Sequence, residues 1–524
     1  MSFANNNDAR MSFSTMPVQV FEEEPYESAK AKGFDDFEAM LTCGGDDRSL
    51  ILESSTNKYH IRPQPVDPAH VFRGSCTGNP PTQRGYDAAK KLYEELSAMP
   101  DGSLDSAIED VFADQRKRIS TILQLEEGTE VIIVPSGSDA EYLPVAIARA
   151  LKGNVPIANG ITQLREIGAG SAPAAVGEYF STHAPLKGKL SEDAKILEGF
   201  EGLDGINIPA REKNGDAINA SQKMDEFIAT SQANGQYPIV HGVFGGKTGI
   251  RDDKMPASMD CGETSLGVVD ACQGRFSLDE LHDWLKQDSI VLYTSSKFYQ
   301  APPFCGAVII PPKIATKLRN SPAPEPKEMY TIDGLGGFLT DKELPDCLNN
   351  WKPLLAKEKS ANLGLALRWE AGLAGMEAMA SYPDGDRTAA YKEWADSVAN
   401  MVRAKTELDP WCVERSIVSI RVAKQDGWLS MSELRDLYRW MSMDMSSFVP
   451  EATAEEKNAL SKPAYIGQPV DVSETHAIVR IALGVESMLS YFDDKAKTLE
   501  EDQTVVLKLA AIGKHFDTLK KSGL

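Results

Sequence analysis

Short apolar runs alternate with segments of helical periodicity from about residue 85 onward, and this rhythm constrains the fold more than any other feature. The clearest run is VIIVP at residues 131–135, which is apolar without alternation, as in a strand buried on both faces of a parallel sheet. The alternation therefore predicts an α/β fold around a mainly parallel sheet. Further strands are expected at residues 238–243, 266–270, 289–294 and 306–310, and helices at 86–98, 104–123 and 142–151.

A proline-rich stretch at residues 321–327 (SPAPEPK) interrupts this rhythm. Beyond it we expect a long helix at 363–382, strands at 417–422 and 477–483, and a closing helix at 504–520. The predicted organisation is an N-terminal arm and extension (1–84), a large α/β domain (85–340) and a smaller α+β domain (341–524). About the first 20 residues are expected to form a mobile arm.

The charge of the chain limits its partners. Among 524 residues, 77 are acidic and 55 are basic, which gives a net charge of −22. A field of that sign repels nucleic-acid phosphates and anionic lipids, so neither a nucleic acid nor a membrane is an expected partner. A single anionic ligand stays compatible with this charge, because a local pocket can be positive.

The seven cysteines are scattered and form no CxxC pair, so reduced thiols in the cytoplasm are expected rather than a disulfide framework or a bound metal. The N-terminus has no apolar core of a signal peptide, and no apolar run is long enough for a membrane span.

The segment HGVFGGKT at residues 241–248 comes close to a phosphate-binding P-loop. That motif needs a glycine five residues before the glycine of GK[ST], but His241 stands there, and GIRDDKMP, which follows, does not form a helix. A turn at the end of a strand is the favoured interpretation.

Three other segments carry chemistry in a consistent order. PSGSD at 135–139 follows a strand and opens a helix, which suits an anion, although a simple helix cap by Ser138 or Asp139 explains it too. LGVVDACQGR at 266–275 places Asp270 at the end of a strand, where a lone aspartate is usually a cap. Lys297 follows another strand and precedes an aromatic, proline-rich loop. Apolar surroundings disfavour the ammonium form of a lysine and favour a nucleophilic amine.

These segments together resemble the fold-type I enzymes that use pyridoxal 5′-phosphate (PLP), with an aspartate aminotransferase-type large domain, and most closely the class-V aminotransferase and cysteine desulfurase branch. The resemblance implies that Asp270 pairs with the pyridine nitrogen and that Lys297, 27 residues later, forms the Schiff base with the cofactor. It further implies that Gln273 lies near the ring hydroxyl. The positions that match the phosphate-binding residues of the family are Gly137, Ser138, Asp139, Thr294 and Ser296.

Arg480, in IVRIALG, resembles the family arginine that holds the substrate carboxylate; an edge-strand arginine that faces solvent is the equal alternative. The sequence also departs from the family. No aromatic residue or histidine occurs within 160–171, where a ring-stacking side chain is usual, so Tyr142, Phe180, His183, Glu166 or a small residue could take this place.

The expected function is that of a PLP-dependent enzyme that acts at Cα of an amino acid, with transamination favoured. A β-lyase that cleaves a C–S or C–C bond, as cysteine desulfurases and kynureninases do, is the alternative. Cys412 is expected to be a packed thiol, which counts against desulfurase chemistry. The resemblance alone implies a homodimer. From other classes, a P-loop-like nucleotide-binding protein and a catalytically silent scaffold stay open.

Overall fold

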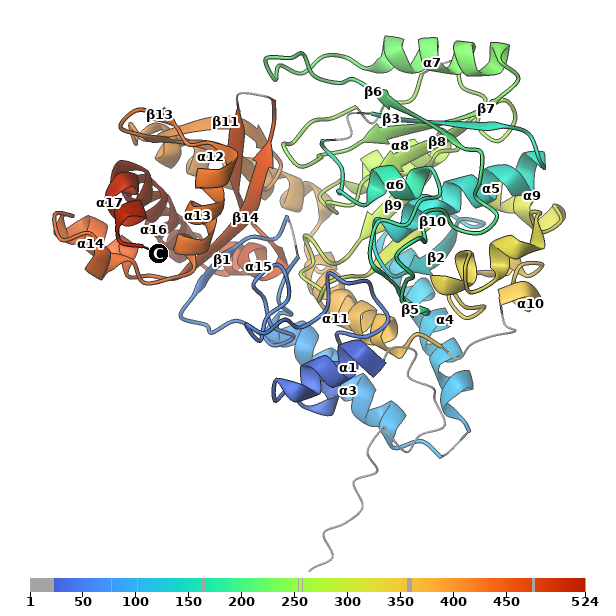
Figure 1. The fold of residues 1–524 in the computed structure, drawn as a ribbon, viewed down its shortest axis with the longest axis horizontal. Coiled ribbons are helices and arrows are strands. Elements are labelled where there is room, and N and C mark those ends of the chain that lie inside the picture. Colours follow the sequence, from blue (N-terminus) through green and yellow to red (C-terminus); the bar gives the residue numbers. More distant parts are fainter. Residues whose placement is uncertain are drawn as a thin grey trace, which may run out of the picture.

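The computed structural model describes residues 23–76, 78–100, 102–162, 165–252, 254–256, 258–355, 361–473 and 476–523. The arm expected over about the first 20 residues lies outside these ranges. Two β-sheets organise the molecule, and Figure 1 shows them side by side, the larger one among the green and teal elements and the smaller one among the orange elements. Within the described residues, no helix is long and apolar enough to cross a membrane.

The larger sheet has seven strands in the part of the chain that the structure describes. Their order is β2 (Glu130–Val134), β10 (Gly306–Ile310), β9 (Ile290–Thr294), β8 (Leu266–Asp270), β7 (Tyr237–Val243), β3 (Ile157–Thr162) and β6 (Asp204–Ile208). All neighbours pair in parallel except β10, which is antiparallel to β2 and β9. The segment 295–305 between β9 and β10 contains no helix and is too short for the crossover that a parallel pair needs. The predicted α/β fold with a mainly parallel sheet is confirmed.

Both faces of this sheet are buried, which explains the unbroken apolar run in β2. Val131 and Ile133 pack into one hydrophobic cluster, and Ile132 and Val134 into another on the opposite face. The first cluster includes residues of α3 (Gln83–Ser97), α4 (Leu104–Ile122) and α11 (Leu363–Ala380). The second includes residues of α5 (Tyr142–Lys152) and α9 (Pro312–Asn320).

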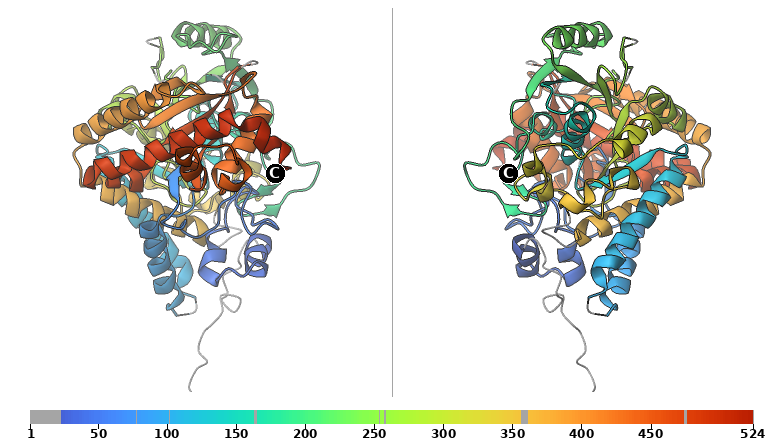
Figure 2. Two further views of the ribbon diagram at one scale, coloured as in Figure 1. Left: turned by 90° about the vertical axis from the view of Figure 1, so that its left-hand side faces the viewer. Right: turned by 90° about the vertical axis from the view of Figure 1, so that its right-hand side faces the viewer.

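The smaller sheet has the order β1 (Val71–Arg73), β14 (Ala464–Asp471), β15 (Ala477–Ala482), β12 (Ile417–Lys424) and β11 (Leu408–Glu414), with β13 (Gly427–Trp428) beside β12. Its helices include α12 (Asp384–Arg403), α13 (Met431–Met441), α14 (Ala454–Leu460) and α16 (Lys495–Lys514), and Figure 2 shows the long red α16 in front of this sheet. The helix predicted at 504–520 is instead α16 followed by α17 (Phe516–Lys521). It begins earlier because the carboxylate of Asp494 accepts a hydrogen bond from the backbone N–H of Lys497.

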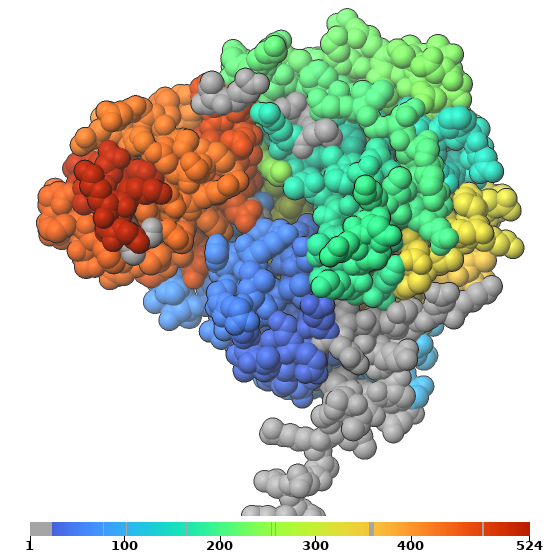
Figure 3. Space-filling view, in the orientation of Figure 1, coloured from blue at the N-terminus to red at the C-terminus, as the bar shows by residue number. Residues whose placement is uncertain are grey.

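The N-terminal region joins the two sheets. It contains α1 (Glu23–Ala31) and α2 (Asp36–Met40), and its strand β1 pairs in parallel with β14 of the smaller sheet. In Figure 3 the blue surface of this region lies between the orange and the teal-green surfaces. The division into domains at residues 84 and 340 stays a prediction.

The remaining helices and strands are η2 (Asp139–Glu141), α6 (Ser171–Ala175), β4 (His183–Ala184), β5 (Gly188–Lys189), α7 (Ser221–Ala233), α8 (Leu278–Lys286), η3 (Lys327–Tyr330), η4 (Leu335–Gly337), η5 (Asp346–Leu348), α10 (Lys352–Leu355), η6 (Ser446–Phe448) and α15 (Val485–Asp493).

A buried ion pair anchors β1 to the C-terminal helices. The Nε of Arg73 lies 2.5 Å from an Oδ1 of Asp502, and Trp394 donates a hydrogen bond from Nε1 to the other oxygen at 2.8 Å. Arg73 and Asp502 are both buried. Because a buried carboxylate without its cation is costly, this pair makes the position of β1 depend on α12 and α16.

We predict that Arg73→Leu lowers the free energy of unfolding by about 3–5 kcal/mol, because it leaves Asp502 buried and uncompensated. Arg84→Leu is the matched control: it removes an ion pair to Glu486 in which the two side chains are 46% and 37% exposed, and should cost less than about 1 kcal/mol. Urea unfolding followed by tryptophan fluorescence measures both variants. Equal losses in the two would contradict this account.

Candidate active site

Four loops meet at one edge of the larger sheet. They follow the carboxyl ends of β2, β7, β8 and β9, and these strands all run in the same direction because the parallel set β7–β9 is linked to β2 through antiparallel β10. Ligands of open α/β sheets bind at this edge. A cavity of about 780 Å³ lies there, and residues of β14 and β15 from the smaller sheet complete its wall.

The structure brings nearly all the predicted site residues to this one cavity. Asp139 is the exception, since it is buried behind the loop at the start of η2. The predicted residues that line the cavity are Gly137, Ser138, Asp270, Gln273, Thr294, Ser296, Lys297 and Arg480.

The loop after β2 is shaped as an anion site. The Oγ of Ser136 accepts hydrogen bonds from the backbone N–H groups of Ser138 and Asp139 at 3.1 and 3.2 Å, so both donors converge on one point and would be available to an anion once the Ser136 hydroxyl turns away. Burial, together with the charge of nearby Asp46, raises the pKa of Asp139 to about 7. The backbone of Asp139 therefore suits an anion better than its carboxyl group does.

Two further features fit a phosphate group at this end of the cavity. A side-chain carbon at Gly137 would lie 2.8 Å from the Sγ of Cys272 and 2.9 Å from the Cγ2 of Thr294, so the chain stays close-packed only with glycine. The Oγ of Ser296 is buried and has no hydrogen-bond partner within the described residues. An anion with several acceptor oxygens would satisfy such donors.

Lys297 is held through its backbone. The Nδ2 of Asn79 donates hydrogen bonds to the carbonyl oxygens of Ser296 and Lys297 at 2.5 and 3.0 Å. Thr294, three residues before the lysine, donates a hydrogen bond from its hydroxyl to the carbonyl of Cys272 at 2.8 Å. This bond links the ends of β8 and β9. Lys297 therefore projects from a fixed loop beside Asp270.

Asp270 is almost fully buried at the end of β8, and its Oδ1 accepts a hydrogen bond from the backbone N–H of Cys272 at 3.0 Å. Behind it, an Oε2 of Glu141 lies 3.2 Å from the Nδ1 of His241. Burial and the charge of Asp270 raise the pKa of Glu141 well above its ordinary value, and burial lowers the pKa of His241 to about 3. The charged forms of both groups are therefore disfavoured next to Asp270.

Arg480 lies on β15, an inner strand between β14 and β12, and is only 1% exposed. The alternative of a solvent-facing edge-strand arginine is therefore wrong. Its Nη2 donates to the carbonyl of Gln468 at 3.0 Å and its Nη1 to the carbonyl of Lys247 at 3.3 Å. No carboxylate pairs with Arg480 in the described part of the chain, although a buried guanidinium normally needs one.

The side chain of Gln273 lines the cavity, where its Oε1 accepts a hydrogen bond from Nη1 of Arg275 at 2.9 Å. Of the residues proposed to take the place of the ring-stacking side chain, Phe180 and Glu166 line the cavity. Tyr142 instead packs in the core, where it donates from its hydroxyl to the carbonyl of Glu178 at 2.8 Å.

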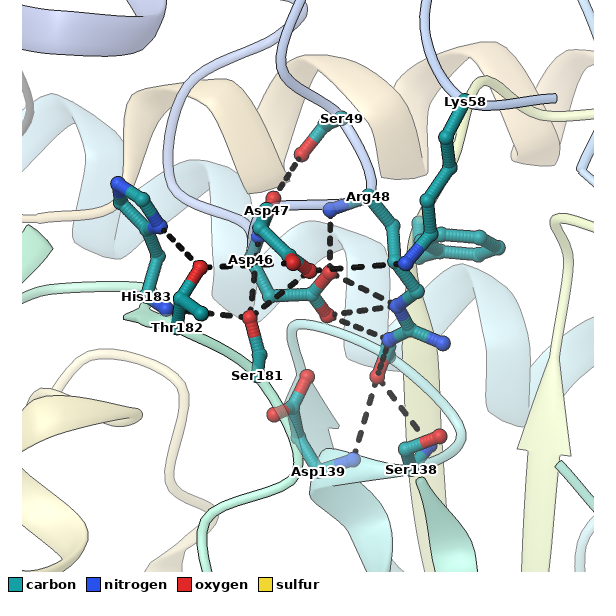
Figure 4. Close-up of polar contacts among 12 residues, drawn as sticks. Asp46, Asp47, Arg48, Ser49, Lys58, Ser138, Asp139, Ser181, Thr182 and His183 are labelled. Atoms are coloured by element: carbon teal, nitrogen blue, oxygen red, sulfur yellow. Dashed lines mark hydrogen bonds and ion pairs between the residues drawn. The ribbon is translucent and has the colours of Figure 1, made fainter. Parts of the chain in front are cut away.

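Sequence reasoning missed Arg48, which the N-terminal region brings over the anion loop (Figure 4). Its guanidinium forms an ion pair with buried Asp46 and donates from Nη2 to the Oγ of Ser136 at 3.0 Å. The ring of Phe304 lies 4.3 Å from its Cζ. The letters DDRS around Arg48 give no sign of this position, because a contact to Ser136 depends on tertiary folding alone.

The segment that resembles a P-loop forms a turn after β7, as predicted, and no helix follows it directly. The hydroxyl and backbone N–H of Thr248 both bond to the carboxylate of Glu166, so they are not directed at a nucleotide. Lys247, however, lines the cavity. Lys247 is part of the sequence motif at 241–248, but it was not predicted to lie in the same cavity as Lys297 and Asp270.

No family model and no curated protein matches this sequence. Solved structures match it. The glutamate decarboxylase domain of diaminobutyrate-pyruvate transaminase and L-2,4-diaminobutyrate decarboxylase from Vibrio parahaemolyticus is 13% identical, with a TM-score of 0.52 over 95% of this chain and 92% of that one. Tryptophan decarboxylase from Catharanthus roseus, in complex with L-tryptophan, is 14% identical, with a TM-score of 0.51 over 84% and 82%. At these identities the likeness concerns the fold, and the fold of this chain is that of the fold-type I PLP-dependent enzymes.

Proposed function

We propose that the protein is a PLP-dependent enzyme that acts at Cα of an amino acid, and that its reaction is transamination. One observation carries this proposal: Lys297 and Asp270 face the same cavity, with an anion loop at one end and, in its wall, the guanidinium of Arg480, which has no carboxylate partner within the described residues. This set matches the needs of a phosphorylated pyridine aldehyde and of a substrate carboxylate. The four features together, a lysine, a buried aspartate, an anion loop and an arginine, therefore support this cofactor and this class of substrate.

The residues present fit the cofactor. Its phosphate would be held by the backbone of residues 137–139 and by the hydroxyl of Ser296, which lacks a partner within the described residues. Arg48, whose charge is paired with that of Asp46, donates a hydrogen bond to Ser136 of this loop. Asp270 would hold the proton on the pyridine nitrogen, and PLP, when bound, supplies an electron sink for the bond broken at Cα.

The chain's own residues then account for orientation and proton transfer. Arg480 would hold the α-carboxylate as a bidentate pair, which turns Cα toward Lys297. The amine of Lys297 would take the proton from Cα and deliver it to the aldehyde-derived carbon of the cofactor, on the other side of the substrate nitrogen, as a general base and then a general acid. Asn79 keeps the lysine backbone in place during both transfers.

Transamination is favoured over desulfuration because Cys412, the single cysteine after residue 347 in the sequence, lies on a strand of the smaller sheet rather than on an exposed loop. Cys412 is half-buried on β11, and burial raises the pKa of its thiol to about 11. A thiol in that state is a poor nucleophile near pH 7. The decarboxylases with a similar fold make CO₂ release a further outcome to measure.

We predict that holoprotein, given one amino acid as donor and a keto acid as acceptor, forms one new amino acid for each keto acid released from the donor. The ratio is one to one because both half-reactions use the same Cα proton transfer. Chromatography of both products measures this ratio. Release of ammonia, sulfide or CO₂ without amino transfer would show a lyase or a decarboxylase instead.

We predict that PLP added to the purified protein gives an absorption band near ~420 nm, which a lysine-linked pyridoxal group produces. Gly137→Ala should weaken PLP binding about tenfold, because the new methyl group would meet Cys272 and Thr294 and displace the loop. Gly385→Ala is the matched control, since a carbon added there meets nothing within 4 Å. No band in the wild type, or equal affinities in all three proteins, would refute the assignment of this cavity.

A further inference from the structure

Two of the cationic residues that line the cavity contact no carboxylate within the described residues. These are Lys247 and Arg480, and Arg480 donates from Nη1 to the carbonyl of Lys247 at 3.3 Å. In the described part of the chain, neither the ammonium of Lys247 nor the guanidinium of Arg480 forms an ion pair or a hydrogen bond with a carboxylate. The Nε of Arg480 is buried and has no partner among the same residues. Such charges are costly unless an anion joins them.

The nearest carboxylate to these cations is already engaged. Glu166 forms an ion pair with Arg211 at 2.8 Å, and it also accepts a hydrogen bond from the backbone N–H of Thr248 at 2.9 Å. Glu166 is only 2% exposed, so its oxygens have little room for another partner. Its charge is therefore shared with Arg211, and Lys247 has no carboxylate in direct contact within the described residues.

The other carboxylates that line the cavity form no ion pair with Lys247 within the described residues. Asp47 accepts a hydrogen bond from the hydroxyl of Ser181 at 2.9 Å and lies 3.7 Å from the Nζ of Lys58 (Figure 4). Asp270 is the partner of the pyridine nitrogen in the proposed function. Asp471 is exposed at the rim. The inner wall therefore carries an excess of positive charge within a protein of net charge −22.

Lys247 lies away from the anion loop. It follows β7, whereas the loop of residues 136–139 follows β2, and β8, β9 and β10 lie between these two strands in the sheet. Burial and the charges of Arg480 and Lys297 lower the pKa of Lys247 to about 8, and the carboxylates of Glu166 and Asp270 oppose this shift only in part. Lys247 therefore belongs to the part of the cavity where the substrate would lie.

We propose that the amino acid substrate carries a second carboxylate on its side chain, and that Lys247 binds this group while Arg480 binds the α-carboxylate. The inference rests on the proposed function and extends it to the substrate class. One carboxylate neutralises one of the two cations, and a second is needed for the other. Lys247 is thereby a specificity-determining residue rather than a part of the proton transfer.

The test uses unreactive acids, which bind without turnover. Isothermal titration of the holoprotein compares succinate and glutarate with butyrate and pentanoate, which match them in length but carry one carboxylate. We expect each diacid to bind about tenfold or more tightly than its monoacid, as a charge-assisted hydrogen bond predicts. Equal affinities of diacid and monoacid in the wild type would overturn the proposal without any variant.

The variants locate the effect. Lys247→Gln should weaken diacid binding about tenfold and change monoacid binding less than about twofold, and Lys247→Arg should restore most of the diacid affinity. Lys223→Gln removes the same charge from the exposed surface of α7 and should bind diacids as the wild type does. Equal weakening of both acid classes by Lys247→Gln would overturn the assignment to Lys247. The wild-type band near ~420 nm separates the two proposals, because its absence refutes the cofactor whereas equal acid binding in a yellow protein refutes only the substrate class.

Discussion

The parallel pairing of β7, β8 and β9 brings the candidate site together. Val243 lies opposite Asp270, and Asp270 lies opposite Leu292, so the residues that follow these strands emerge side by side. A shift of one residue in this register would turn the side chain of Asp270 to the opposite face of the sheet, away from the cavity. The apolar residues of both faces are buried and set the register, so the packing of the core and the geometry of the site depend on the same pairing.

Electrostatics within the cavity run opposite to those of the whole molecule. A chain of net charge −22 directs Lys247, Lys297 and Arg480 into one cavity, and it adds Arg48 above the anion loop. Behind Asp270, burial raises the pKa of Glu141 and lowers the pKa of His241, which disfavours the charged form of both groups. The site therefore presents one negative group for a pyridine nitrogen and several positive groups for phosphate and carboxylates. Its positive charges need an anionic ligand to offset the cost of burial.

Local patterns were enough to predict the parts of the site that lie next to strands. The expected strand at 266–270 coincides with β8, which ends at Asp270, and Lys297 lies in the loop directly after β9. β3 and β6 were not predicted, because IANGIT and DGINI contain glycine and asparagine that weaken the strand pattern. Arg48 and Lys247 could not be predicted as site residues, since their contacts to Ser136 and Arg480 span 88 and 233 residues of sequence.

The central claim is that Lys297 binds PLP covalently, and Lys58 and Lys247, which also line the cavity, make this claim open to a direct test. Borohydride reduction of PLP-loaded protein, followed by proteolysis and mass spectrometry, identifies the lysine that carries the pyridoxyl group. We expect the label on Lys297 and none on Lys58 or Lys247, because Lys297 lies in the loop between the anion site and Asp270. A label on Lys58 or Lys247, or no label on any of the three lysines, would contradict the account.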